Sequence, residues 1–476
     1  MSHGDRFFRL LGFLLLGYAL LGKGFAYLGV GPLFIGEITL LYGLFALSTT
    51  TNWSRILRTA WLWPLFAFMA WGAFRTLPFI RIFGVNALRD GAVWIWGLFA
   101  VVISSLLAAE PRRLAELELK FRKFALIFLL IVPITYTLGN LFSGSMPLAP
   151  WAAVPLILIK GGDVVVHLTG VFAYTVLMGG GFSPLFVAVA TMLDLGLTFT
   201  GRAAMVTFGA GAAIVAILRP KSPIVLRLFP SLLIGFALLW ILDIHITGHP
   251  GEDGRDISAQ QIIENVQSIF TQSDNENLSG SKEWRLLWWD KVIRYTVHGP
   301  YFWTGKGFGI NLADDDGFQV KDDGSLRSPH NGHITMLARG GVPGFSLWIL
   351  CQISFAGAML YSAYLAHSRG QKRWSSLFVV LFVYWIGFMA NAAFDVYLES
   401  PLGGIWLWSV FGVGIGAAWI YRNAPETFAD EIYAQLDQQI SLDIPVTPRP
   451  LVARFPKPQP PTELPAPAST TEPATT

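Results

Sequence analysis

The chain is poor in cysteine and in charged residues. Its one cysteine, Cys351, lies within an apolar run, so no disulfide framework can form. Only 14% of the 476 residues are charged, whereas 53% are hydrophobic, and the apolar residues form long runs between short charged connectors. This composition excludes a soluble globular protein and is typical of a protein that crosses a membrane many times.

The apolar runs are continuous where the strands of a membrane barrel would alternate, so a β-barrel is excluded and the spans are expected to be helices. With about 20 residues per span, the sequence predicts an all-α polytopic membrane protein of about twelve transmembrane helices and one large external loop that contains short helices. The predicted spans are residues 8–28, 31–49, 59–75, 91–108, 124–142, 163–180, 184–200, 203–218, 225–246, 342–366, 375–394 and 402–420.

These spans divide the chain into four predicted parts: a nine-helix N-terminal bundle (1–246), an external loop with active-site segments (247–341), C-terminal transmembrane helices (342–420) and a disordered Pro-rich tail (421–476). Within the loop, residues 257–270 are predicted to form a helix on the membrane surface. A second helix is predicted to start at a Ser281 cap and to run to about Thr296, followed by a glycine-rich turn at 305–309.

Lysine and arginine in the short loops predict the orientation. Four basic loops fall on one side of the twelve-helix arrangement, namely residues 55–58, 112–123, 219–227 and 369–373. The positive-inside rule makes that side, and both termini, cytoplasmic, and it makes the large loop periplasmic in the inner membrane of a bacterium. Arg75, Arg81 and Arg89 fall outside against this rule, which indicates either an anionic ligand or lipid headgroups.

The segment after the large loop carries a spaced motif. His330-Asn331 is followed by nine residues, then Gly341, two residues and Gly344. Three further segments stand in order on the external side, namely residues 200–204 (TGRAA), 284–285 (WR) and 394–401 (FDVYLESP). Over about residues 180–420 these features resemble the bacterial O-antigen ligase and polymerase superfamily. Arg339 departs from that pattern, because many members carry an acidic residue near this position.

The resemblance implies a glycosyltransferase that takes a glycan from undecaprenyl pyrophosphate and transfers it, with inversion, to an acceptor at the periplasmic face. It implies no metal, no cofactor and no nucleic-acid partner. The acceptor would be lipid A-core in a ligase, another lipid-linked glycan in a polymerase, or a protein hydroxyl in an O-oligosaccharyltransferase. The sequence does not choose among the three.

The residue types fit this chemistry in their own right. Sugar transfer from a pyrophosphate requires stabilisation of the departing pyrophosphate and removal of a proton from the acceptor hydroxyl. Guanidinium groups suit the first task and an imidazole suits the second. Since all three residues map to the external face, we assign His330 as general base and Arg202 and Arg285 to the pyrophosphate. Their structural alternatives are a loop histidine, a snorkelling arginine and a surface ion pair.

A second group of residues is expected to have secondary or structural roles. Gly341 and Gly344 are expected to let the chain turn into the tenth span, with Pro343 in its first turn. The secondary site candidates are Arg75, Arg81, Arg89, Asn331, His333, Arg339, Asp395 and Glu399. The acidic runs 314–316 and 322–323 lack a metal-binding spacing, so they predict a solvated loop without a metal site.

Two readings from other classes compete with a transferase. A lipid-linked sugar flippase or secondary transporter would use charged groups within the membrane, for which Glu37, His167 and Asp194 are candidates. These three are scattered over separate spans, and structural ion pairs explain them equally well. A structural scaffold for polysaccharide assembly is the third reading, and it would survive replacement of His330.

Overall fold

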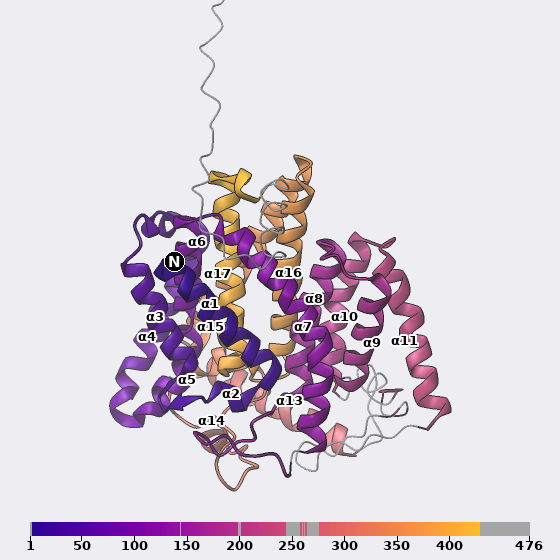
Figure 1. The fold of residues 1–476 in the computed structure, drawn as a ribbon. Helices are drawn as coiled ribbons and strands as arrows, with labels where there is room; N and C mark the ends of the chain where they lie inside the picture. The colour runs from indigo at the N-terminus through magenta and orange to yellow at the C-terminus, as the bar shows by residue number, and fades with distance from the viewer. Residues whose placement is uncertain are drawn as a thin grey trace, which may run out of the picture.

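The computed structural model describes residues 2–142, 144–198, 201–243, 258, 260, 262–263 and 276–428 (Figure 1). The first half contains α1 (His3–Leu21), α2 (Lys23–Ala26), α3 (Ile35–Ser48), α4 (Trp63–Phe83), α5 (Val85–Ile95), α6 (Gly97–Ala109) and α7 (Arg113–Leu141). The middle contains α8 (Gly161–Leu177), α9 (Pro184–Thr198), α10 (Arg202–Leu218) and α11 (Pro223–Ile241). The last part contains α13 (Glu276–Thr296), α14 (Leu312–Asp316), α15 (Gly332–Ser368), α16 (Lys372–Ala392) and α17 (Pro401–Asn423).

Short elements connect these helices. A hairpin of β1 (Gly29–Val30) and β2 (Leu33–Phe34) pairs antiparallel. The 3-10 helices are η1 (Trp53–Arg58), η2 (Ala60–Leu62), η3 (Tyr397–Glu399) and η4 (Pro425–Phe428). Apart from the hairpin, the regular structure of the described residues is helical, as the continuous apolar runs predict.

Each of the twelve predicted spans overlaps a helix. Within the described residues, seven segments are long and apolar enough to cross a membrane, namely Ala60–Phe83, Val85–Ala109, Arg113–Leu141, Pro223–Ile241, Gly332–Ser368, Lys372–Ala392 and Pro401–Asn423. The helices α3, α8, α9 and α10 are apolar but shorter. The multi-pass character is therefore confirmed, and the number of twelve crossings stays a prediction.

Several helix ends differ from the predicted ones. The helix α4 continues through Pro78 to Phe83, so that Arg75 and Arg81 lie on a helix and not in a loop. The predicted cap at Ser281 is wrong, because α13 already begins at Glu276. Apolar runs mark membrane-length segments, and polar residues extend a helix beyond them at little cost. The predicted surface helix at 257–270 and the tail after residue 428 lie outside the described residues.

The helix α17 forms the centre of the bundle and is buried along most of its length. Its glycines allow α6 to approach closely: a Cβ on Gly412 would lie 2.9 Å from Ala100, and a Cβ on Gly416 would lie 2.8 Å from Leu107. Small residues at helix crossings are the usual basis of tight packing in membranes. The helices α15 and α16 pack beside α17, while α4 and α11 lie at opposite edges (Figure 1).

The two ends of the bundle differ in character. At one end, Arg113 pairs with Asp5 at 3.0 Å, which joins α7 to the N-terminal helix, and Arg373 pairs with Glu118 at 3.4 Å, which joins α16 to α7. The helices α13 and α14 lie at the opposite end (Figure 1). This arrangement agrees with the predicted grouping of the basic loops on one side and the large loop on the other.

The helix α15 is broken at Gly341, which has a φ of 67°. A side chain at this position would meet the Phe302 carbonyl oxygen at 2.6 Å, so glycine is required both by its conformation and by the close approach of the loop. Val342 and Pro343 then begin the longer half of α15, as predicted. The kink separates a short helical segment of residues 332–340 from the apolar part.

The loop between α13 and α15 packs onto α4. Side chains of Phe79 and Phe83 cover Gly307 and Gly309, which have positive φ angles of 83° and 108°. This confirms the predicted glycine-rich turn and explains why it contains glycines. The turn brings the loop down onto the membrane helices beside the segment that contains His330.

Candidate functional site

A large cavity lies at the end of the bundle that carries α13. Its volume is about 1920 Å³, and it is lined by α3, α5, the ends of α7 to α10, α13, the segment 325–330 and the connection between α16 and α17. Pockets for drug-sized ligands have volumes of about 300–1,000 Å³, so this cavity has room for a larger ligand. His330, Arg202 and Arg285 all line it.

His330 occupies a sharply turned position at the start of α15. Its φ of 51° lies in the left-handed region, and Asn331 caps the following helix by accepting hydrogen bonds from the backbone nitrogens of His333 and Ile334. Trp289 of α13 donates a hydrogen bond of 2.8 Å to the Pro329 carbonyl oxygen. The loop is therefore held from both sides, and the imidazole remains 32% exposed to the cavity.

Asp395 is the partner of this imidazole. Its Oδ1 lies 3.7 Å from His330 Nδ1, an ion-pair separation, and its Oδ2 lies 3.8 Å from Lys160 Nζ. Burial raises the pKa of the Asp395 carboxyl, but the interactions with His330 and Lys160 outweigh burial and hold that pKa well below its usual range. Asp395 is thus a permanent anion beside the imidazole.

The two predicted pyrophosphate ligands come from elements far apart in sequence. Arg202 is the first residue of α10, and Arg285 lies on α13, where its Nη1 donates a hydrogen bond of 3.3 Å to the Phe394 carbonyl oxygen. Asp290, considered as a surface partner of Arg285, pairs instead with Arg294 at 2.6 Å. The fold therefore brings both arginines to the cavity that also holds His330 and Asp395.

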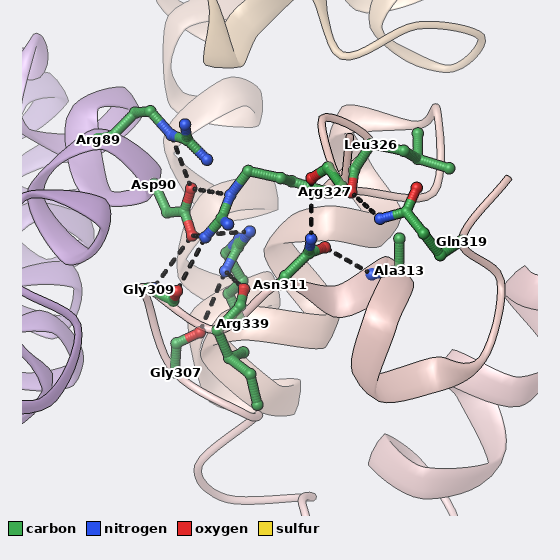
Figure 2. Close-up of polar contacts among 12 residues, drawn as sticks. Arg89, Asp90, Gly307, Gly309, Asn311, Ala313, Gln319, Leu326, Arg327 and Arg339 are labelled. Carbon is green, nitrogen blue, oxygen red and sulfur yellow. Dashed lines mark hydrogen bonds and ion pairs between the residues drawn. The ribbon is translucent and has the colours of Figure 1, made fainter. Parts of the chain in front are cut away.

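Asp90 on α5 lines the cavity and is the centre of a charged cluster, whose contacts Figure 2 shows. Arg327 donates two hydrogen bonds to its carboxylate, at 3.3 and 2.8 Å, and Arg339 Nη2 lies 3.1 Å from Oδ2. The Gly309 backbone nitrogen donates to the same Oδ2 at 3.1 Å, and Arg89 Nε lies 3.6 Å from Oδ1. We call Arg89, Asp90, Arg327 and Arg339 the Asp90 cluster. It connects α5 to the segment three residues before His330.

Arg339 has a structural position. It is completely buried, does not line the cavity, and donates hydrogen bonds to the carbonyl oxygens of Gly307 and Ile310 in addition to its ion pair with Asp90. The departure from the family pattern at this residue is thereby accounted for by the presence of Asp90 opposite.

Replacement of Asp90 by asparagine is expected to destabilise the protein by about 3–5 kcal/mol, because it leaves the buried guanidinium of Arg339 and the partly buried guanidinium of Arg327 without their anion. The measurement is the thermal unfolding of the purified protein in detergent. The matched control is Asp322→Asn. Asp322 is exposed and lies in the loop that contains Arg327, so this variant should unfold like the wild type. Equal unfolding of both variants would contradict the role of the cluster.

The three predicted external arginines are separated by the structure. Arg75 donates a hydrogen bond of 2.7 Å from Nε to the Thr304 carbonyl oxygen, and neither Arg75 nor Arg81 lines the cavity. Arg89 does line it, and its side chain is 52% exposed. Among these candidates, Arg89 is therefore the one that can meet a ligand in the cavity.

His333 and Gly344 have packing partners. His333 Nδ1 accepts a hydrogen bond of 3.1 Å from Trp348, and its Nε2 lies 3.1 Å from the Met389 carbonyl oxygen. A side chain at Gly344 would lie 2.8 Å from Trp71 Nε1. These contacts agree with the predicted orienting and packing roles, and neither residue lines the cavity.

The acidic run at residues 314–316 is occupied by protein contacts. Asp316 accepts hydrogen bonds from Trp288 Nε1 at 2.7 Å and from the Tyr295 hydroxyl at 3.3 Å, and Lys306 pairs with Asp315 and Asp316. Within the described residues, no group of three or more histidine, cysteine or acidic side chains is arranged to hold a metal ion. Asp316 therefore has a structural role, whereas the sequence predicted a solvated acidic loop.

The charged candidates within the spans do not come together. Glu37 accepts hydrogen bonds from Trp96 Nε1 at 3.1 Å and from the Phe34 backbone nitrogen, and it lines the cavity. His167 lies between the hydroxyls of Tyr384 and Tyr397, at 2.7 and 3.1 Å. These contacts favour the structural reading for Glu37 and His167. The buried carboxylate oxygens of Asp194 have no hydrogen-bond partner within the described residues, so the ion pair expected for a structural role is absent there.

Glu399 lines the cavity near the Asp90 cluster. Its Oε1 is buried and has no hydrogen-bond partner within the described residues. Burial, only partly opposed by the charge of Arg339, raises the pKa of Glu399 to about 7. A carboxyl group in this state changes its charge within the physiological pH range.

The raised pKa of Glu399 predicts a pH-dependent effect of Glu399→Gln on stability. The unfolded chain releases this proton at a pH of about 4.3, whereas the folded protein keeps it up to a pH of about 7. Between these values the folded state binds more protons, so wild-type stability falls as the pH rises. The melting temperature of the variant minus that of the wild type should therefore increase over this interval and then level off. A difference independent of pH would contradict the raised pKa.

Three residues of the site were missed by sequence reasoning. Asp90 and Arg327 are 237 residues apart in the chain, and Lys160 precedes α8 without any motif. The available signal for Asp90 was an acidic residue next to Arg89 within an apolar segment. Such a residue needs a partner in a membrane protein, but the sequence does not say which one.

Residues 186–349 match a family model described as O-antigen ligase. The matched range contains Arg202, Arg285, His330, Gly341 and Gly344, so the predicted resemblance is confirmed over the part of the chain that carries these residues. Asp90 and Asp395 lie outside it. A comparison with curated proteins gave no match.

Proposed function

We propose, from the match of residues 186–349 to a family model described as O-antigen ligase, that the protein is a membrane glycosyltransferase that uses undecaprenyl-pyrophosphate-linked glycans. The acceptor that we propose first is lipid A-core. A polymerase that extends lipid-linked glycans is the alternative within the same superfamily. Both reactions place the same demands on the site: a base for the acceptor hydroxyl and cations for the pyrophosphate.

The observation that carries the proposal is the pairing of His330 with Asp395 at 3.7 Å in a cavity that also contains Arg202 and Arg285. Because Asp395 faces Nδ1, it favours the tautomer with the proton on Nδ1, and Nε2 is then the nitrogen that accepts a proton. The carboxylate also stabilises the imidazolium that forms. His330 is thus equipped to act as a general base.

The proposed reaction is a single displacement. The acceptor oxygen attacks the anomeric carbon of the donor while its proton passes to His330 Nε2, and the bond from that carbon to the pyrophosphate oxygen breaks. The leaving pyrophosphate takes the bonding electrons, and Arg202 and Arg285 stabilise its charge through hydrogen bonds. Attack opposite to the leaving group inverts the anomeric configuration. The pyrophosphate bond supplies the driving force, so the step requires no nucleotide.

Placement in the membrane follows from the same features. The cavity lies at the end of the bundle opposite to the basic loops, and the positive-inside rule makes this end periplasmic. We therefore propose a protein of the bacterial inner membrane with both termini in the cytoplasm and a periplasmic active site. The position of the cavity at one membrane face favours a transferase over a transporter, whose site would lie near the midplane.

The test is reconstitution of the full chain with a defined undecaprenyl-pyrophosphate glycan, with chelator present, and with lipid A-core, a second lipid-linked glycan or a hydroxylated peptide as separate acceptors. Product on lipid A-core would identify a ligase, and longer lipid-linked chains would identify a polymerase. Product on the peptide would identify an O-oligosaccharyltransferase and would contradict the lipid acceptor. Absence of product with every acceptor would overturn the proposed function.

A further inference from the structure

The cavity has a second cationic wall, separate from the predicted pyrophosphate ligands. Arg202 lies on α10, which packs against α8 and α16, whereas Arg89 lies on α5, which packs against α4, α6 and η3. Arg89 lines the cavity together with Arg327 and Asn86, and we call these three residues the α5 wall. A pyrophosphate bound by Arg202 and Arg285 would leave the α5 wall without an anion.

The α5 wall has an excess of positive charge. Asp90 already receives two hydrogen bonds from Arg327, one from Gly309 and the ion pair of Arg339. Within the described residues, the one ion pair of Arg89 joins its Nε to Asp90 at 3.6 Å, and its side chain is 52% exposed. Even with Glu399 ionised, the three arginines of the Asp90 cluster face two carboxylates, which leaves one positive charge without an anionic partner. A guanidinium in such a site is suited to bind an anion.

The surroundings of Arg89 identify the kind of molecule that carries the anion. Val85 and Leu88 lie on α5 with Arg89, also line the cavity, and are 56% and 38% exposed. Apolar side chains that are both exposed and beside a cationic site suit an amphipathic ligand, with its chains in lipid and its charged headgroup in the cavity. Two guanidinium groups from separate segments can each bind a different oxygen of a phosphate.

We propose that Asn86, Arg89 and Arg327 form a subsite that binds a phosphate of the acceptor headgroup. The inference rests on the proposed transferase function and adds the residues that would position the acceptor. Arg89 is the principal ligand, while Arg327 shares its guanidinium with Asp90. The subsite would hold the acceptor headgroup on one side of His330 while the donor pyrophosphate lies at Arg202 and Arg285.

The first test measures binding without turnover. The variant Arg202→Ala/Arg285→Ala removes the donor ligands, and the binding of glucose 1-phosphate to it in detergent is followed by broadening of the phosphorus NMR signal. Addition of Arg89→Ala should weaken this binding by about tenfold or more, the loss expected for a charge-assisted hydrogen bond. Addition of Arg81→Ala is the matched control: it removes the same charge at an exposed position outside the cavity and should leave binding unchanged.

The second test measures transfer with intact and with enzymatically dephosphorylated lipid A-core. Arg89→Ala should raise KM for the intact acceptor by about tenfold, with little change in kcat or in KM for the donor, and should have no effect on the dephosphorylated acceptor. Arg89→Lys, which keeps the charge, should restore part of the affinity. A structural role of Arg89 would instead lower the use of both acceptors equally, and that result would overturn the proposal.

A membrane phospholipid is the other source of a phosphate at this wall. Repeating the transfer assay in nanodiscs with and without phosphatidylglycerol distinguishes a phospholipid headgroup from a phosphate of the acceptor. If Arg89→Ala abolishes a dependence on phosphatidylglycerol but leaves the effect of acceptor phosphate unchanged, the ligand is a headgroup and the acceptor assignment is overturned. If the wild type transfers to no acceptor, the proposed function fails, and the NMR measurement still decides whether the phosphate subsite exists.

Discussion

Replacement of His330 by alanine is expected to lower transfer by about 10²–10⁴-fold, the usual contribution of a positioned general base. The loss should appear in kcat, because the imidazole acts on the proton that moves in the transition state and contributes little to binding of the donor. Since the side chain is 32% exposed in the cavity, its removal should leave the melting temperature close to that of the wild type. The measurement is single-turnover transfer together with donor binding.

The matched control for this variant is His298→Ala. His298 is an exposed histidine after α13 and lies outside the cavity, so the same chemical change there should leave transfer intact. Full activity of His330→Ala would remove this residue as the base. It would also favour the scaffold reading, which requires no imidazole in the cavity.

The second large effect is expected from the donor arginines. Arg202→Ala and Arg285→Ala should each lower kcat/KM for the donor by about 10²–10³-fold, because each removes a cationic hydrogen-bond donor from the leaving pyrophosphate. KM for the acceptor should change little. The double variant is expected to lose less than the product of the two effects, since both groups act on the same charge. Initial rates over a range of donor and acceptor concentrations give both kcat/KM for the donor and KM for the acceptor.

Arg294→Ala serves as the control on α13. Arg294 is 77% exposed and pairs with Asp290 on the outer surface, so its loss removes a charge from the same helix without changing the cavity. A defect in acceptor use alone for Arg202→Ala or Arg285→Ala would contradict the assignment to the pyrophosphate. The same measurement separates these arginines from Arg89, for which the opposite pattern is expected.

The sequence predicted the helices well because lipid offers no hydrogen-bond partners. An apolar run long enough to cross the membrane must therefore pair its backbone N–H and C=O groups within the run, as a helix does. The sequence predicted helix ends less well. The helix α7 begins at Arg113, whereas the apolar run that predicted it starts only at about residue 124. The helix α4 continues through Pro78, beyond the predicted end of its span at residue 75. Charged residues favour helix almost as strongly as apolar ones, so the change in hydropathy marks the edge of the lipid and not the end of the helix.

For the site, the spaced motif selected His330, and the family resemblance together with residue type selected Arg202 and Arg285. The fold brings all three to one cavity, and their roles stay a prediction. Motif spacing could not identify Asp90, because the partners of a buried acid are determined by packing between distant segments and not by local spacing. Arg339 illustrates the difference: the family pattern marked it as unusual, and its structural reason is the ion pair of 3.1 Å with Asp90 together with its hydrogen bonds to the carbonyl oxygens of Gly307 and Ile310.

The way in which the external loop rests on α4 limits how this protein can be divided. Phe79 and Phe83 cover Gly307 and Gly309. A Cβ atom added at these glycines would lie 2.2 and 2.7 Å from the two phenylalanine side chains, so this part of the loop packs against apolar residues of α4 and not of the loop itself. The loop is therefore not a module. A soluble fragment of residues 276–331 should fail to fold by itself, and a chimera that exchanges this loop with that of a related enzyme should need α4 and the Asp90 region from the same parent.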